Sequence, residues 1–273
     1  MEHNLSSPII VENPWERLNA FTGARIGLGR AGVSLPTRKL LAFQLAHARA
    51  QDAVHCPLDV DALATELTDT LGLTASPIRL HSQAQGRAMY LQRPDYGRRL
   101  NDEARKCLQK AAASQQRYDL AVAVVDGLSA FAVQQNSAPF LSGLYRSLNE
   151  DAVDWKLAPL TIVEQGRVAI GDEVGALLNA DAVLVVIGER PGLSSPDSLG
   201  LYMTWAPEPG LRDDQRNCIS NVRPAGLKVD EAARRLVLLL KEARQRKLSG
   251  VQLKDRSENN ILEGGESNSI GVW

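Results

Sequence analysis

The sequence has few of the residues that build metal centres, disulfide frameworks and nucleophilic active sites. Its 273 residues include 4 histidines and 3 cysteines, and no histidine follows His81. The cysteines, Cys56, Cys107 and Cys218, are odd in number and far apart, which matches neither a disulfide framework nor a zinc spacing. We therefore expect no metal site, no Ser/His/carboxylate set, and a chain that works in the reducing cytoplasm.

The sequence also lacks an excess of charge of one sign and any long hydrophobic run. Its formal net charge is -1, and no extended run of lysine and arginine occurs, so a nucleic-acid surface is not expected. No stretch of about 18 apolar residues is present, and the first residues do not combine a basic start with an apolar core. These absences argue against a membrane span and a signal peptide.

What the sequence does contain is a regular alternation of apolar runs and helical patterns in its C-terminal part. Strands are predicted at 120–125, 160–163, 183–187 and 201–205, and helices at 171–179 and 229–246. Strands that alternate with helices on this scale predict right-handed crossovers and a parallel sheet. The expected fold class is therefore α/β, with a Rossmann-like, mainly parallel sheet in the C-terminal two-thirds.

The N-terminal part is predicted to be mostly helical. Helical spacing begins after Pro36 and recurs at 60–71 and 101–113, whereas 88–92 is expected to be a short extended piece. We predict four parts, namely an N-terminal arm at 1–30, a helical domain at 31–115, a Rossmann-like domain at 116–250 and a disordered tail at 251–273.

A literal GxGxxG occurs at Gly27, Gly29 and Gly32, which raises the alternative of a nicotinamide-dependent oxidoreductase. A dinucleotide fingerprint needs a buried strand before the glycines and a helix directly after them. The preceding residues 18–25 do not read as a buried strand, and Pro36 comes soon after. The motif is more simply a basic loop, with Arg25 and Arg30 available to hold an anionic partner group.

Polar loops that follow two predicted strands form the candidate site. Asp126 and Ser129 come after the strand at 120–125, and Glu189 and Arg190 come after the strand at 183–187. In open α/β sheets, ligands bind in the crevice outside the carboxyl ends of the strands. A third piece at 216–221, which contains Cys218, joins the last strand to the last helix and is expected to lie alongside. These polar side chains suggest a binding site. The alternative is that Glu189 belongs to an ordinary turn that faces solvent.

Several segments together resemble the family of ethanolamine ammonia-lyase small subunits. They are Gly29-Arg30-Ala31-Gly32, residues 90–100 (YLQRPDYGRRL), Asp126-Gly127-Leu128-Ser129, residues 188–193 (GERPGL) with Ser198-Leu199, and Cys218-Ile219-Ser220-Asn221. They occur in order and span about residues 11–253. Each piece alone is weak, but the combination is specific.

The resemblance implies a cobalamin-binding role for residues 116–250. In this family the contacts to adenosylcobalamin would fall on Val168, Glu189 and Cys218. The large subunit, a TIM barrel, would hold ethanolamine and the catalytic side chains. The resemblance thus implies no catalytic residues in this chain, no activity alone, and a hetero-oligomer that deaminates ethanolamine to acetaldehyde and ammonia by radical chemistry.

Two further points bear on the cofactor and on location. The Asp-x-His-x-x-Gly signature of proteins that replace the lower cobalt ligand by histidine is absent, because Asp52 and His55 have the wrong spacing. Cobalamin is therefore expected to keep its own dimethylbenzimidazole on cobalt. Some relatives carry a longer N-terminal extension linked to bacterial microcompartments, so both a cytoplasmic and a microcompartment location remain open.

Beside the lyase subunit and the nicotinamide-dependent oxidoreductase, a third class of function is a scaffold that binds no small molecule.

Overall fold

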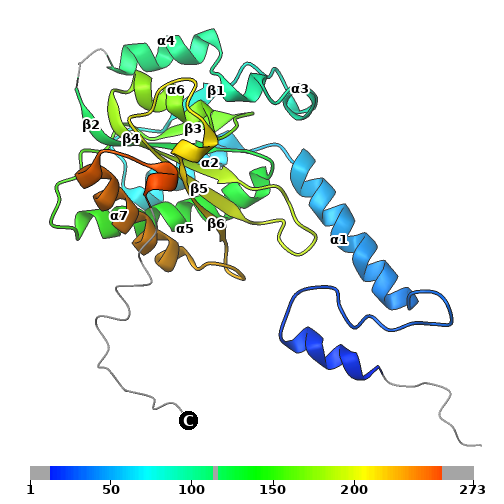
Figure 1. Ribbon diagram of the computed structural model, residues 1–273. Helices are drawn as coiled ribbons and strands as arrows, with labels where there is room; N and C mark the ends of the chain where they lie inside the picture. Colours follow the sequence, from blue (N-terminus) through cyan, green and yellow to red (C-terminus); the bar gives the residue numbers. More distant parts are fainter. Residues whose placement is uncertain (1–12, 113–115, 254–273) are drawn as a thin grey trace, which may run out of the picture.

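The protein has an α/β fold built on one mixed, mostly parallel sheet of six strands in the order β1-β3-β2-β4-β5-β6. The computed structural model describes residues 13–112 and 116–253 (Figure 1). The strands are β1 (Ile78–His81), β2 (Tyr118–Val125), β3 (Thr161–Glu164), β4 (Ala180–Gly188), β5 (Leu199–Trp205) and β6 (Asn217–Val222). The predicted α/β class and mostly parallel sheet are confirmed.

Helices cover both faces of the sheet. The α-helices are α1 (Thr37–His55), α2 (Val60–Leu71), α3 (Arg87–Gln92), α4 (Asp102–Ala111), α5 (Ala130–Asn149), α6 (Ile170–Leu177) and α7 (Val229–Arg246). Short 3-10 helices are η1 (Pro14–Ala20), η2 (Tyr96–Arg98), η4 (Asp213–Gln215) and η5 (Gly250–Gln252). In Figure 1, α5 and α7 lie on one side of the sheet and α4 and α6 on the other, while α1 extends away from the body.

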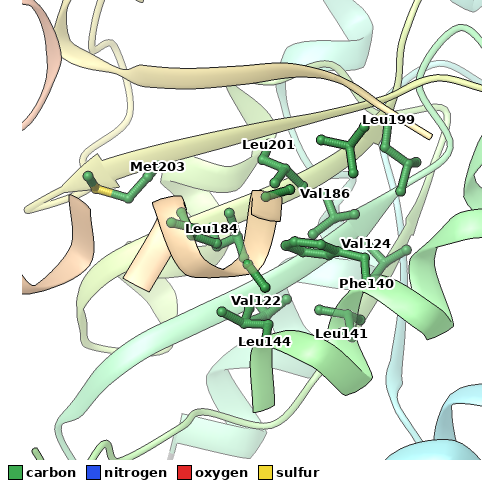
Figure 2. Packing of buried hydrophobic residues seen from close by; sticks show 14 of the residues in the cluster. Val122, Val124, Phe140, Leu141, Leu144, Leu184, Val186, Leu199, Leu201 and Met203 are labelled. Atoms are coloured by element: carbon green, nitrogen blue, oxygen red, sulfur yellow. The ribbon is translucent and has the colours of Figure 1, made fainter. Parts of the chain in front are cut away.

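The central strands are buried on both faces, as their continuous apolar runs predict. Along β4, Leu184 and Val186 pack with α5 and α7, whereas Val183 and Val185 pack with α4 and α6. Figure 2 shows the first of these clusters, in which Phe140 of α5 lies among the side chains of β2, β4 and β5. Side chains that alternate between two cores fix the register of the strand, because a shift by one residue would exchange the two sets.

The sheet turns antiparallel after β4. Strands β1, β3, β2 and β4 run parallel, whereas β5 is antiparallel to β4 and β6 is antiparallel to β5. The connection from β4 to β5, residues 189–198, is too short for a crossover helix, which needs a dozen or more residues. The chain therefore returns beside β4 as a long hairpin, and its loop stays at the carboxyl end of the parallel strands.

Three local predictions were wrong. The segment 88–92 is helical in α3 and not extended, because alanine, methionine, leucine and glutamine favour a helix and Tyr90 thereby turns into the core. Residues 217–222 form the strand β6 and not a joining loop. The apolar spacing of residues 15–26 is compatible with a helix, but the structure has only the 3-10 helix η1 there, which ends at Ala20.

Three residues of the predicted tail fall within the described part of the chain. Residues 251–253 lie against the body, with Leu253 only 2% exposed and its carbonyl accepting a hydrogen bond from Asn217 Nδ2. The rest of the predicted disordered tail, 254–273, and residues 1–12 of the predicted arm lie outside the described residues. The segment 31–115 contributes β1 to the sheet and α2 and α4 to its two faces.

Candidate functional site

A pocket opens at the carboxyl end of the parallel strands, where the chain order of the sheet reverses. From β2 the chain crosses to β3, which lies on one side of β2, and from β3 it crosses to β4, which lies on the other side of β2. Such a switch point leaves a crevice between diverging loops. The pocket has a volume of about 410 Å³ and is lined by Tyr90, Leu128, Arg167, Val168, Ile187, Gly188, Glu189, Arg190 and Tyr202.

Glu189 stands at the end of β4 in a fixed orientation. Its Oε2 accepts hydrogen bonds from Ser198 Oγ at 2.5 Å and from the backbone N–H of Asn221 at 3.2 Å, and its own N–H donates to the Ser198 carbonyl. Within the described residues, no hydrogen bond uses Oε1. The carboxylate is therefore held by one oxygen while the other keeps free lone pairs. Arg190, the next residue of the lining, makes no ion pair with any described residue.

Cys218 lies beside the pocket through its pairing with Tyr202. The two residues are partners in the antiparallel ladder of β5 and β6, and Tyr202 lines the pocket. Partial burial raises the pKa of the Cys218 thiol, the Tyr202 hydroxyl opposes this rise through a hydrogen bond, and the Glu189 carboxylate adds to it. A thiol with a raised pKa is a poor nucleophile, so this group suits contact better than covalent chemistry.

Val168 reaches the pocket because the loop after β3 is tied down by Asp126. The Asp126 carboxylate accepts hydrogen bonds from the backbone N–H groups of Gln165 at 2.8 Å and Gly166 at 3.1 Å. Gln165 has a φ of 53°, a conformation that a non-glycine residue holds only when its surroundings impose it. The two bonds thus fix the path of the chain into α6 and the position of Val168.

Asp126 and Ser129, both predicted as site residues, lie beneath the pocket and not on its surface. Asp126 is 1% exposed and Ser129 is fully buried. The Ser129 hydroxyl donates to the Pro196 carbonyl at 2.8 Å and accepts from the N–H of Ala132, so it caps α5 and holds the loop between β4 and β5. We expect both side chains to position the lining rather than to touch a ligand.

The ionisation of Asp126 opposes folding, which gives a pH prediction. Burial raises its pKa to about 6 from 3.8, although the N–H groups of Gln165 and Gly166 and the Arg87 guanidinium oppose the rise. Because the folded pKa is the higher one, the protonated form favours folding and stability falls as pH rises. Relative to Asp126→Asn, which does not titrate, the wild-type free energy of unfolding should fall by roughly 1.4 kcal/mol between pH 5 and pH 7.5.

Urea unfolding of both proteins at the two pH values measures this change, since the other titrating groups cancel in the difference. A difference between wild type and Asp126→Asn that stays constant, or that grows in favour of the wild type as pH rises, contradicts the assignment of a buried carboxyl with a raised pKa.

Sequence reasoning missed Tyr90 and Arg167. The Tyr90 ring lies between two guanidiniums, with Arg167 Cζ 4.1 Å and Arg87 Cζ 4.8 Å from its centroid. Tyr90 Oη donates to the Gly166 carbonyl, and Arg167 Nη2 donates to the Tyr90 carbonyl. The stacking of two arginines on one ring fixes the rear wall of the pocket. A helical reading of 88–92 would have turned Tyr90 inward and been the only available signal.

The glycine motif at 27–32 has the wrong surroundings for a dinucleotide. Gly27, Gly29 and Gly32 have φ values of 58°, 74° and 64°, and 3-10 helix η1 precedes them in place of a buried strand. A Cβ on Gly27 would lie 2.4 Å from the Trp15 carbonyl oxygen, so the first glycine serves a tight local turn. The structure therefore gives the nicotinamide alternative no support.

The described part of the chain offers neither a metal site nor a membrane span. Residues 13–112 and 116–253 contain no group of three or more histidine, cysteine or acidic side chains placed to hold a metal ion. None of the described helices combines the length and the apolar character needed to cross a bilayer. The pocket lining has no histidine.

Comparison with known proteins gives consistent matches along nearly the whole chain. Residues 12–254 match the family described as ethanolamine ammonia-lyase light chain (EutC). A protein of Ralstonia nicotianae named ethanolamine ammonia-lyase small subunit is 52% identical over 262 residues, which cover 96% of this chain and 95% of that protein. Proteins of the same name from Pseudomonas syringae pv. tomato and Pseudomonas aeruginosa strain UCBPP-PA14 are 54% and 53% identical, covering 93% of this chain and 88% and 91% of their own lengths.

Proposed function

Because the chain belongs to the family of ethanolamine ammonia-lyase small subunits, we propose that its pocket forms one wall of the cobalamin site of that enzyme. The family is cobalamin-dependent, and the name small subunit implies a complex with a large subunit. The observation that carries the proposal is the position of Glu189 and Val168 in one open pocket at the switch point of the sheet.

The chemistry of the lining fits the edge of a corrin ring with its amide side chains. Leu128, Val168 and Tyr202 offer apolar surface, while Glu189 Oε1 is a free acceptor. At the rear wall, Arg167 Nε is buried and has no hydrogen-bond partner among the described residues. An amide group carries both an N–H donor and a carbonyl acceptor, so an acceptor and a donor in one pocket match it.

The proposed contribution of this chain is to bind and orient the corrin. Glu189 would accept a hydrogen bond from one amide side chain, Val168 would pack against the ring, and Cys218 would contact the corrin beside Tyr202 as a neutral thiol. Arg190 extends the polar rim of the same pocket. Adenosylcobalamin, when bound, supplies the radical that takes hydrogen from ethanolamine, and this chemistry belongs to the cofactor. This chain lacks the Asp-x-His-x-x-Gly signature and so would supply no histidine from that motif in place of the cofactor's own dimethylbenzimidazole.

The substrate would be held elsewhere, on the large subunit. Within the described residues the pocket has no acid–base pair and no metal group from which a deamination centre could be built. The chain alone is therefore proposed to be inactive.

The test compares the isolated chain with the complex of both subunits. We expect an absorbance titration to show adenosylcobalamin bound by the complex, and acetaldehyde to form from ethanolamine only when the large subunit is present. In the same absorbance titration, a nicotinamide dinucleotide should give no saturable binding signal. Ethanolamine turnover by the purified single chain would overturn the proposal. So would an active complex in which a photoreactive corrin forms no crosslink to this chain.

A further inference from the structure

The exposed large hydrophobic side chains of the described residues are concentrated in one segment. Twelve such side chains are exposed, and ten of them lie between residues 15 and 45. They are Trp15, Leu18, Phe21, Ile26, Val33, Leu35, Leu40, Leu41, Phe43 and Leu45. Scattered apolar residues on a surface are ordinary, but such a concentration of large apolar side chains in one segment indicates a place of contact with another molecule. We call residues 14–49 the docking arm.

The docking arm projects from the body, and contacts within the arm hold its loop against α1. In Figure 1 helix α1 extends outward, and η1 with the following loop lies at its far end. Lys39 Nζ pairs with Glu16 at 2.7 Å, and Asn13 Nδ2 donates to the Gly27 carbonyl at 2.6 Å. The loop and α1 enclose a largely apolar groove of about 600 Å³, lined in part by Leu28, Leu35, Leu40 and Phe43.

Helix α1 buries very little against its own chain. Its only buried side chains are Ala50 and Ala53, both near the end that joins the body. A helix of 19 residues that is exposed along most of its length, with leucines and a phenylalanine at the surface, is not stabilised by the packing seen here. Its apolar side chains therefore need a surface that this chain does not supply within the described residues.

The charge of the docking arm indicates the kind of surface that it fits. It carries six cationic side chains, Arg17, Arg25, Arg30, Arg38, Lys39 and Arg49, against one carboxylate, Glu16, in a chain of net charge -1. Among the residues that the structure describes, only Lys39 pairs with that carboxylate. A second copy of the chain would bring like charges together, which is unfavourable. A complementary partner is apolar and acidic.

The docking arm is continuous with the pocket. Arg25 Nη2 donates to the Leu193 carbonyl at 3.1 Å and Nη1 donates to Ser194 Oγ at 3.3 Å. Leu193 and Ser194 belong to the loop between β4 and β5, which begins at Glu189. A partner that covers the pocket therefore also reaches the docking arm.

We propose that the docking arm seats on an acidic, apolar surface of the large subunit and is a main anchor of the complex. The proposal rests on the proposed function, because it takes the large subunit as the molecule that faces the pocket. The arm provides the area and the charge complementarity, while the pocket faces the corrin. Affinity between the subunits is thus carried by residues that do not touch the cofactor.

The test replaces exposed apolar side chains of the docking arm by glutamate in the co-expressed complex. Phe21 is 86% exposed and Leu41 is 58% exposed, so neither substitution disturbs the core. We expect Phe21→Glu and Leu41→Glu each to weaken subunit association at least tenfold, measured by sedimentation velocity of the purified subunits. The matched control is Val251→Glu, since Val251 is 72% exposed but lies outside the arm, and it should associate as the wild type does.

Salt and charge reversal give an independent readout. Association of the wild type should weaken as NaCl rises, and the double variant Arg17→Glu with Arg30→Glu should weaken association and reduce this salt dependence. Wild-type association of the Phe21 and Leu41 variants overturns the proposal. Two other results would also overturn it. If the isolated chain self-associates and these variants abolish that self-association, the arm binds a second copy of the chain. If deletion of residues 1–12 or 254–273 is what makes the arm sensitive to proteolysis, the arm binds a terminal segment of its own chain.

Failure of this proposal is distinguishable from failure of the proposed function. If the pocket does not face the corrin, Glu189→Gln leaves corrin affinity unchanged while the arm variants still dissociate the subunits. If the docking arm is not an anchor, the arm variants assemble normally while Glu189→Gln still weakens corrin binding.

Discussion

Replacing Arg216 by methionine should lower the free energy of unfolding by about 3–5 kcal/mol at pH 7, because it leaves a carboxylate buried without a partner. The side chains of Arg216 and Asp172 are 2% and 1% exposed. Arg216 donates to both oxygens of Asp172, to Thr204 Oγ1 at 3.2 Å and to the Leu211 carbonyl at 3.0 Å. This network joins α6 to β5 at the point where β6 begins. Urea unfolding measures the loss.

Two comparisons separate an unpaired charge from a general packing defect. The double variant Asp172→Leu with Arg216→Met removes both charges and should recover most of the stability, since a buried pair replaced by apolar groups is often nearly neutral. Arg146→Met breaks a pair whose side chains are 63% and 84% exposed and should change stability little. Unfolding of Arg216→Met within about 1 kcal/mol of wild type contradicts this account.

The effect should also depend on pH in a stated direction. Burial raises the pKa of Asp172, and the hydrogen bond and charge of Arg216 oppose that rise. Without Arg216 the pKa rises further, so Asp172 takes up a proton at a higher pH and its burial then costs less. The deficit of Arg216→Met should therefore shrink as pH falls.

The parts of the fold that the sequence predicts well are those with a strong local signal. Strands β2 and β4 are continuous apolar runs because both faces of each strand are covered. Strands β1 and β6 escape prediction because they lie at the edges of the sheet and carry polar residues, such as Arg79 in β1 and Asn221 in β6. Edge strands need less apolar surface, so their short polar sequences resemble loops.

The site is predicted where a loop directly follows a strong strand and is missed where distant segments meet. Glu189 is found in the sequence because it follows β4, and the structure places it in the pocket. Asp126 and Ser129 follow β2 in the same way, but their loop turns inward and their polar atoms bind other loops. Tyr90 and Arg167 are far apart in the chain and meet only through tertiary packing.

Replacing Glu189 by glutamine should weaken binding of adenosylcobalamin to the two-subunit enzyme by about ten- to a hundredfold. A hydrogen bond to a charged group contributes roughly 1.5 to 3 kcal/mol, and 1.4 kcal/mol is a tenfold change in affinity. Glutamine can still accept from Ser198 and Asn221 through one oxygen, but it places an amide N–H where the free Oε1 now lies. Two donors would then face each other. Turnover at saturating cofactor should change much less, because the proposed role is to hold the corrin.

Titration of the reconstituted complex with adenosylcobalamin, followed by absorbance, tests whether Glu189 holds the corrin. Wild type, Glu189→Gln and the control Glu208→Gln are compared, since Glu208 is exposed and lines a different pocket, together with Arg117 and Lys247. We expect the dissociation constant to be raised about ten- to a hundredfold for Glu189→Gln alone. Equal dissociation constants for all three proteins would contradict it, and would make Glu189 a solvent-facing turn residue.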